Sequence, residues 1–254
     1  MRYTQISSNE KETTKEEMMK RTIAAIVMGL VFIAFTFMVK TYDVSPIGPA
    51  GTEVGFSHIN QRVHEQIGFN QTWYDMTDYL GYAVLAVCGI FALAGLVQLI
   101  KRRSLLKVDS EILILGVYFV VVMGFYVLFE KLVINYRPVI MDGETMPEAS
   151  YPSSHTMLVV TVMLAVAIIV GRYFKNEYVG TFMRTMCIFV TVVMVVGRYY
   201  SGVHWATDIV GGLLLSFALL LAFHAAIAAA PDRRGSYEGQ SAQPASTRLY
   251  KPKH

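Results

Sequence analysis

Six apolar stretches of transmembrane length constrain this 254-residue chain more than any other feature. A helix needs about 20 predominantly apolar residues to cross the hydrocarbon core of a bilayer. Hydrophobic residues make up 54% of the chain and charged residues only 16%, which excludes an ordinary soluble enzyme, a disordered chain or a fibrous repeat. We therefore predict an all-α integral membrane protein, a bundle of six transmembrane helices. The stretches cover residues 22–39, 76–100, 112–134, 156–170, 182–196 and 207–230.

The same pattern divides the chain into one membrane domain, residues 22–230, and two short tails. Residues 1–21 mix both signs of charge with Ser and Thr, which indicates a solvated cytoplasmic tail or a helical lead-in. Residues 231–254 are polar and contain Gly, Ser and Pro, which predicts a disordered cytoplasmic tail. The connection over residues 41–75 interleaves apolar and polar residues and favours an interfacial helix or a lid.

Lysine and arginine residues gather on one side of the predicted bundle. Seventeen of the 22 lie in the two tails, the second-to-third connection and the fourth-to-fifth connection. Because connections rich in Lys and Arg stay in the cytoplasm, we predict cytoplasmic termini and outward-facing first, third and fifth connections. This topology also accounts for the net charge of +3, so no nucleic-acid partner is expected.

Three polar segments lie on or beside the outward-facing connections, at residues 131–138, 152–155 and 198–208. Together they place two histidines, an aspartate and up to three cations at one membrane face. Such a set is typical of a site that handles a phosphate group, and ionisable residues inside a membrane protein usually serve function.

The histidines have distinct predicted roles. Asp208 follows His204 by four residues, so on a helix their side chains share a face and can form a hydrogen bond. That bond would orient the ring and leave its other nitrogen free to attack phosphorus. His155 comes from a different helix and is predicted to protonate the departing group as a general acid.

Phosphate binding is assigned to a helix start and to nearby cations. Ser153 and Ser154 directly follow Pro152 and open an apolar helix, so backbone N–H groups and the positive end of the helix dipole face any anion there. No metal ion or other cofactor is needed in this scheme. The cations predicted to neutralise the phosphate oxygens are Arg137, Arg198 and Lys131.

Each of these residues has a simpler interpretation when it is taken alone. A histidine at a helix end is usually an interfacial polar residue, an arginine there contacts lipid headgroups, and a serine caps the helix. We interpret the remaining histidines in this way. They are His58, His64, His224 and His254. The catalytic interpretation depends on the three polar segments lying at the same membrane face. Unpaired ionisable groups there would have a high cost in free energy unless they served a function.

At these residues the sequence resembles the type 2 phosphatidic acid phosphatase (PAP2) family, the membrane lipid phosphatases related to vanadium haloperoxidases and bacterial acid phosphatases. The family's motifs are Lys-x6-Arg-Pro, Pro-Ser-Gly-His and Ser-Arg-x5-His-x3-Asp. The third matches over residues 198–208, with Gly197 in place of its leading Ser. The second matches over residues 152–155, with Ser154 in place of Gly.

The first motif departs further from the family. Arg137 and Pro138 match, but the spacing places Glu130 where the family has lysine, and Lys131 follows one residue later. One residue turns a helix by about 100°, so Lys131 reaches the phosphate only if the helix end unwinds or the long side chain bends. The alternative is that Lys131 extends to the membrane interface, beside Glu130.

The resemblance implies a six-helix bundle with a haloperoxidase-like core, metal-independent catalysis and a phosphohistidine intermediate on His204. It also implies Asp208 as the orienting partner and His155 as the acid. The implied phosphate ligands are Lys131, Arg137, Ser153, Ser154 and Arg198.

We therefore expect a phosphatase of membrane lipid phosphates at the outer face of a bacterial cytoplasmic membrane. Undecaprenyl pyrophosphate, phosphatidylglycerol phosphate and phosphatidic acid are the candidate substrates that the resemblance implies, and the sequence does not rank them firmly. One alternative is a lipid phosphotransferase that uses the same histidine. Another is a non-enzymatic lipid carrier whose charges bind headgroups. The sequence does not indicate an oligomeric state.

Overall fold

The computed structural model describes residues 2–171, 173–174 and 176–230. Over these residues the chain is helical, and no β-strand is present. The short 3-10 helices are η1 (Pro49–Gly51) and η2 (Leu105–Lys107). The α-helices are α1 (Arg2–Thr41), α2 (Ser57–Ile67), α3 (Gln71–Arg102), α4 (Ser110–Lys131), α5 (Ser154–Val170), α6 (Glu177–Ser201) and α7 (Ala206–Ala229). The all-α class predicted from the sequence is confirmed.

Five helices in the described part of the chain are long and apolar enough to cross a membrane. They are residues Lys15–Thr41 of α1 together with α3, α4, α6 and α7. The sixth predicted crossing, α5, has 17 residues, which corresponds to about 26 Å. The residues directly before it, 150–153, are already buried. The count of six crossings is therefore approximate.

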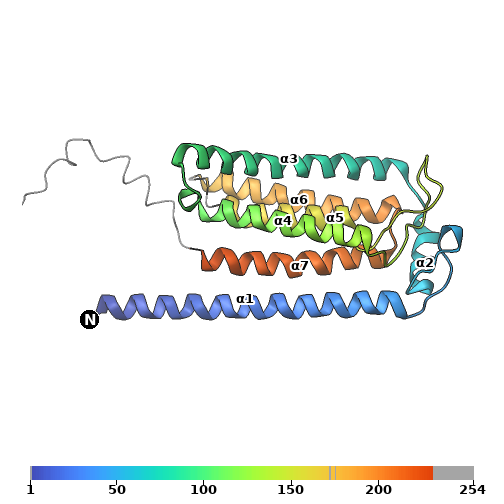
Figure 1. Cartoon of the computed structure of the whole chain (residues 1–254), viewed down its shortest axis with the longest axis horizontal. Helices are drawn as coiled ribbons and strands as arrows, with labels where there is room; N and C mark the ends of the chain where they lie inside the picture. The colour runs from blue at the N-terminus through green and yellow to red at the C-terminus, as the bar shows by residue number, and fades with distance from the viewer. Residues whose placement is uncertain (1, 172, 175, 231–254) are drawn as a thin grey trace, which may run out of the picture.

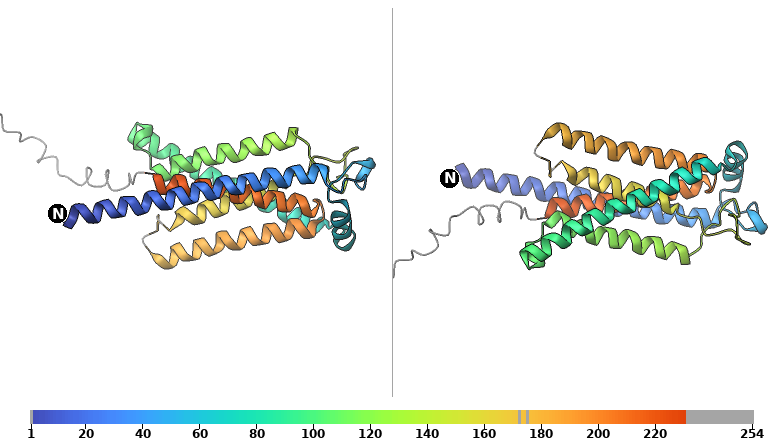
Figure 2. Two further views of the ribbon diagram at one scale, coloured as in Figure 1. Left: turned by 90° about the horizontal axis from the view of Figure 1, so that it is seen from below. Right: turned by 90° about the horizontal axis from the view of Figure 1, so that it is seen from above.

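The short helix α5 occupies the centre of the bundle. Most of its residues are buried, and it packs against α6 and α7 as well as α3 and α4. Helix α1 lies along α7, and α3 crosses the opposite side of the bundle (Figures 1 and 2). Large apolar side chains such as Leu30, Ile90 and Phe189 are exposed on the outer helices. A surface of this kind suits contact with lipid chains.

Helix ends differ from the predicted boundaries where polar caps extend the helices. The Asn70 side chain accepts a hydrogen bond from the Trp73 N–H and starts α3 five residues before the predicted 76. The Asn176 side chain caps the start of α6 in the same way. At its other end, α6 runs past the predicted residue 196 to Ser201. As a result Arg198 lies in the last turn of a helix. Gly202 ends that helix with a φ of 66°, a left-handed conformation that favours glycine.

The two predicted tails have different outcomes. Helix α1 begins at Arg2, so the described part of the segment before residue 22 is a helical lead-in that continues into the apolar stretch. The predicted disordered tail over residues 231–254 lies outside the described residues. In the connection over residues 41–75, α2 forms a short cap over one end of the bundle, which is the end opposite the start of α1 (Figure 1).

Candidate active site

The three polar segments of the sequence meet at the bundle end that carries α2 (Figure 1). The segment between α4 and α5 folds back on itself, so that Tyr136 pairs with Ala149. The Ser153 N–H donates a hydrogen bond to the Asp208 carbonyl oxygen at 2.9 Å. This bond ties the start of α5 to the start of α7 and brings the second and third segments together.

Arg198 is a fully buried cation at the centre of this cluster, with 0% of its surface exposed. Its Nη1 atom donates to the Thr77 hydroxyl at 3.2 Å, and its Nη2 atom lies 3.1 Å from His204 Nε2. The guanidinium also lies over the ring of Tyr74. Because a guanidinium can only donate hydrogen bonds, Nε2 of His204 must accept and therefore carries a lone pair. The ring proton is then on Nδ1.

Asp208 is completely buried beside His204. Its Oδ2 atom accepts a hydrogen bond from the Trp205 N–H at 3.0 Å, and its Oδ1 atom accepts one from the Asn135 side chain at 3.2 Å. The distance from Asp208 Oδ2 to His204 Nδ1 is 3.8 Å, longer than a hydrogen bond. The predicted pair is therefore adjacent, and a movement of less than an ångström would close it.

Arg137 reaches the cluster from the segment after α4. Its Nη2 atom pairs with Glu148 Oε2 at 3.0 Å, and its backbone N–H donates to the Glu148 carbonyl oxygen. The Arg137 side chain is mostly buried, whereas half of the Glu148 side chain surface is exposed. Because the Glu148 carboxylate is open to solvent, an incoming phosphate can take its place on Arg137.

The start of α5 supplies uncharged donors. The first-turn N–H groups of any helix lack acceptors within the helix, and here they belong to Ser154, His155 and Thr156. The Ser153 hydroxyl donates to the Thr156 hydroxyl at 3.0 Å. Ser153 is fully buried and Ser154 is partly exposed, so Ser154 is the more accessible of the two predicted phosphate ligands.

Lys131 is the predicted ligand that the structure does not bring into this network. It is the last residue of α4, it is exposed, and it forms no ion pair with a described residue. Glu130, which has the position of the family lysine by spacing, lines a small hollow with Ser150, Pro152 and Ser154. Phosphate binding by Lys131 stays a prediction.

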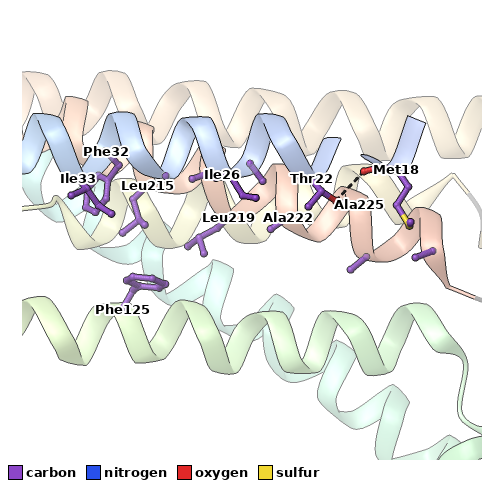
Figure 3. A pocket seen from close by; sticks show the side chains of 15 residues that line it. Met18, Thr22, Ile26, Phe32, Ile33, Phe125, Leu215, Leu219, Ala222 and Ala225 are labelled. Atoms are coloured by element: carbon purple, nitrogen blue, oxygen red, sulfur yellow. Dashed lines mark hydrogen bonds between the residues drawn. The ribbon is translucent and has the colours of Figure 1, made fainter. Parts of the chain in front are cut away.

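His155 lines a mostly apolar cavity of about 300 Å³ between α3, α4 and α5. Its apolar lining includes Leu85, Val122 and Leu158, and its polar lining includes Asp78 and Ser154. A larger cavity of about 600 Å³ lies between α1 and α7, with Phe125 of α4 at its edge (Figure 3). Among the described residues, no ionisable side chain lines that larger cavity, whereas Asp78 and His155 of the predicted site line the smaller one, which is therefore the candidate binding pocket.

Burial lowers the pKa of His204 well below its ordinary value, and the positive charges of Arg198 and Arg137 lower it further. The ring is therefore neutral, and able to attack phosphorus, at pH values where a free imidazole is protonated. We expect the acid limb of kcat/KM that belongs to His204 to lie below pH ~6.5, the usual imidazole value. A pH–rate profile, corrected for ionisation of the substrate phosphate, tests this. An acid limb at or above that value would contradict it.

Several residues of the cluster were not predicted from the sequence. Asn135 lies within the first polar segment, and its position two residues before Arg137 was the available signal. Tyr74, Thr77 and Asp78 come from α3, which carries none of the three motifs. Asn60 of α2 is buried and bonds both the side chain and the backbone N–H of Thr207, holding the cap over the start of α7.

Comparison with known proteins gives two matches. Residues 111–231 match the model of the PAP2 superfamily. The fold is similar to the crystal structure of a transmembrane PAP2 type phosphatidylglycerolphosphate phosphatase from Bacillus subtilis. The two chains are 16% identical with a TM-score of 0.57, and the match covers 79% of this chain and 94% of that one. No curated protein matches the sequence significantly.

Proposed function

We propose that this membrane phosphatase, whose residues 111–231 form a PAP2 superfamily domain, removes phosphate from a lipid headgroup through a phosphohistidine on His204. The observation that carries the proposal is the contact between Arg198 Nη2 and His204 Nε2 at 3.1 Å. It implies that the lone pair is on Nε2, where it accepts a hydrogen bond from the guanidinium until a phosphate takes that donor. A nucleophile and an anion ligand are thus next to each other in a buried, low-dielectric site.

In the first step the Nε2 lone pair of His204 attacks phosphorus, and the bond from phosphorus to the lipid oxygen breaks. His155 gives a proton to that oxygen, so the lipid leaves as an alcohol, or as a monophosphate when the substrate is a diphosphate. Asp208 stabilises the positive charge that develops on the His204 ring through its Nδ1–H.

In the second step water attacks the phosphohistidine. The water gives a proton to His155, the bond from phosphorus to Nε2 breaks, and inorganic phosphate leaves. Both histidines return to their starting protonation states. Arg137, Arg198 and the first-turn N–H groups of α5 stabilise the equatorial oxygens of phosphorus in both steps. For this role Arg137 must exchange Glu148 for the phosphate, and Arg198 must turn its Nη2–H from His204 Nε2 to a phosphate oxygen before the lone pair attacks.

The apolar cavity beside His155 supports a lipid substrate. Its lining is mostly apolar and includes Asp78 and His155, so an acyl or prenyl chain can lie against the apolar residues while the headgroup lies near the polar ones. Phosphatidylglycerol phosphate, undecaprenyl pyrophosphate and phosphatidic acid are the candidates. The distribution of Lys and Arg supports cytoplasmic termini and a site on the outer face of a bacterial cytoplasmic membrane.

A substrate panel on the purified protein in detergent tests this function. We expect free phosphate to be released from at least one of the three lipids. Transfer of labelled phosphate to a second lipid in place of release would favour the phosphotransferase. Binding of all three lipids without turnover would favour the carrier.

The mechanism also predicts a distinct inhibition pattern. Vanadate adopts five-coordinate geometry like the transition state, so we expect it to inhibit phosphate release in competition with the substrate. EDTA is expected to leave the rate within about twofold of the untreated enzyme, since no step uses a metal ion. Loss of activity in EDTA that is restored by magnesium would contradict the mechanism.

A further inference from the structure

One face of α3 forms a fourth wall of the active site. Tyr74, Thr77, Asp78 and Gly81 follow the spacing that places residues on one side of a helix. Tyr74 and Thr77 contact Arg198, whereas Asp78 and Gly81 contact His155. This helix lies outside residues 111–231, the part of the chain that matches the family model.

The contact between Asp78 and His155 is well defined. Asp78 Oδ1 lies 3.0 Å from His155 Nε2, and about a quarter of each side chain is exposed. Because a carboxylate only accepts hydrogen bonds, Nε2 must carry a proton in this contact. The pair differs from His204 and Asp208, whose side chains are 3.8 Å apart.

Gly81 fits the same arrangement. A side-chain carbon at this position would lie 2.9 Å from His155 Cδ2 and 3.2 Å from Nε2, closer than such atoms normally approach. The Cδ2–Nε2 edge of the His155 ring therefore packs directly against helix α3 at Gly81. The Nδ1 atom is on the opposite edge, and it is buried without a hydrogen-bond partner among the described residues.

We propose, on the basis of the proposed function, that Asp78 is a positioning residue for the general acid. It holds the Nε2–H of His155 and so leaves Nδ1 as the atom that exchanges a proton with the departing lipid oxygen and then with water. The carboxylate also stabilises the positive ring that exists before each donation. The site thus contains two histidine–aspartate pairs, one for the nucleophile and one for the acid, with the second aspartate supplied by α3.

Asp78→Asn removes the charge and keeps the shape. The matched control is Asp75→Asn, because Asp75 is an exposed carboxylate on the same helix that bonds only Gln71 among the described residues. Each variant is assayed for kcat/KM with a lipid phosphate and with p-nitrophenyl phosphate. The alkoxide of the lipid needs a proton to leave, whereas nitrophenolate leaves without one. kcat/KM reports only the steps up to departure of this group.

We expect Asp78→Asn to lower kcat/KM for the lipid by about 10- to 100-fold, less than the roughly 10²- to 10⁴-fold that a general acid itself contributes, and for the aryl phosphate by less than about threefold. Asp78→Glu should recover part of the lipid activity, and Asp75→Asn should match the wild type. Adding Asp78→Asn to His155→Ala should cause no further loss, because both changes remove the same function.

Three results would overturn the inference. Equal losses with both substrates would mean that Asp78 only supports the structure, and unchanged lipid activity would mean that it has no role. An additional loss in the double variant would place Asp78 in a separate function. Wild-type protein that releases phosphate from neither substrate would instead refute the proposed function on which the inference rests.

Discussion

Replacing His204 with alanine is expected to lower phosphate release by about 10⁴-fold or more, the scale seen when a nucleophile is removed from a catalytic set. The variant lacks the atom that bonds to phosphorus. The neighbouring groups Arg198 and Asp208 keep their other partners, namely Thr77, Tyr74, Trp205 and Asn135. We therefore expect the protein to fold and to retain substrate binding. The measurement is phosphate release from the best lipid of the panel.

His224→Ala is the matched control for this variant. His224 lies on α7, about 27 Å along the helix axis from its first residue, Ala206, at the helical rise of about 1.5 Å per residue. It should leave turnover within about twofold of the wild type, as expected for a substitution away from the site. Turnover by His204→Ala within tenfold of the wild type would exclude His204 as the nucleophile.

Asp208→Asn is expected to reduce kcat by about 10³- to 10⁴-fold, as the analogous change does in a serine protease triad. The asparagine can still accept the Trp205 N–H through its oxygen. The Asn135 amide can rotate to offer its own oxygen to the new NH₂ group. Folding should therefore be preserved, while the negative charge that stabilises a positive His204 ring is lost.

The midpoint of thermal unfolding and the elution profile in size-exclusion chromatography separate this catalytic loss from unfolding. A normal midpoint together with a large fall in kcat is the expected combination. If kcat changes by less than about tenfold in the folded variant, the carboxylate has no part in the chemistry, and its role is to cap α7 through Trp205.

The sequence predicts the membrane-spanning helices well because their signal is local. Apolar stretches of the required length identify α1, α3, α4, α6 and α7 directly. It predicts helix ends less well, because they depend on polar caps such as Asn70 and Asn176 that lie outside the apolar pattern. The start of α1 at Arg2 shows the same limit, since a polar sequence can continue a helix that an apolar segment begins.

The candidate site is only partly predictable for a related reason. Residues close to a motif in the chain, such as Arg137, His155 and Arg198, are visible from spacing. Contacts between distant segments, such as Arg198 with Thr77 or His155 with Asp78, depend on how α3 crosses the bundle. No periodicity within one helix encodes that crossing. The sequence also could not predict that Lys131 lies outside the network of the site. The direction of a side chain at a helix end depends on the path of the segment that follows.

The stereochemical course at phosphorus tests the central claim most directly. One in-line displacement by water inverts the configuration, whereas two displacements through an enzyme intermediate retain it. Hydrolysis of a chiral, isotopically labelled phosphate ester in labelled water gives a chiral phosphate product whose configuration can be read. We predict retention, because the phosphoryl group is transferred first to Nε2 of His204 and then to water. Inversion would contradict it.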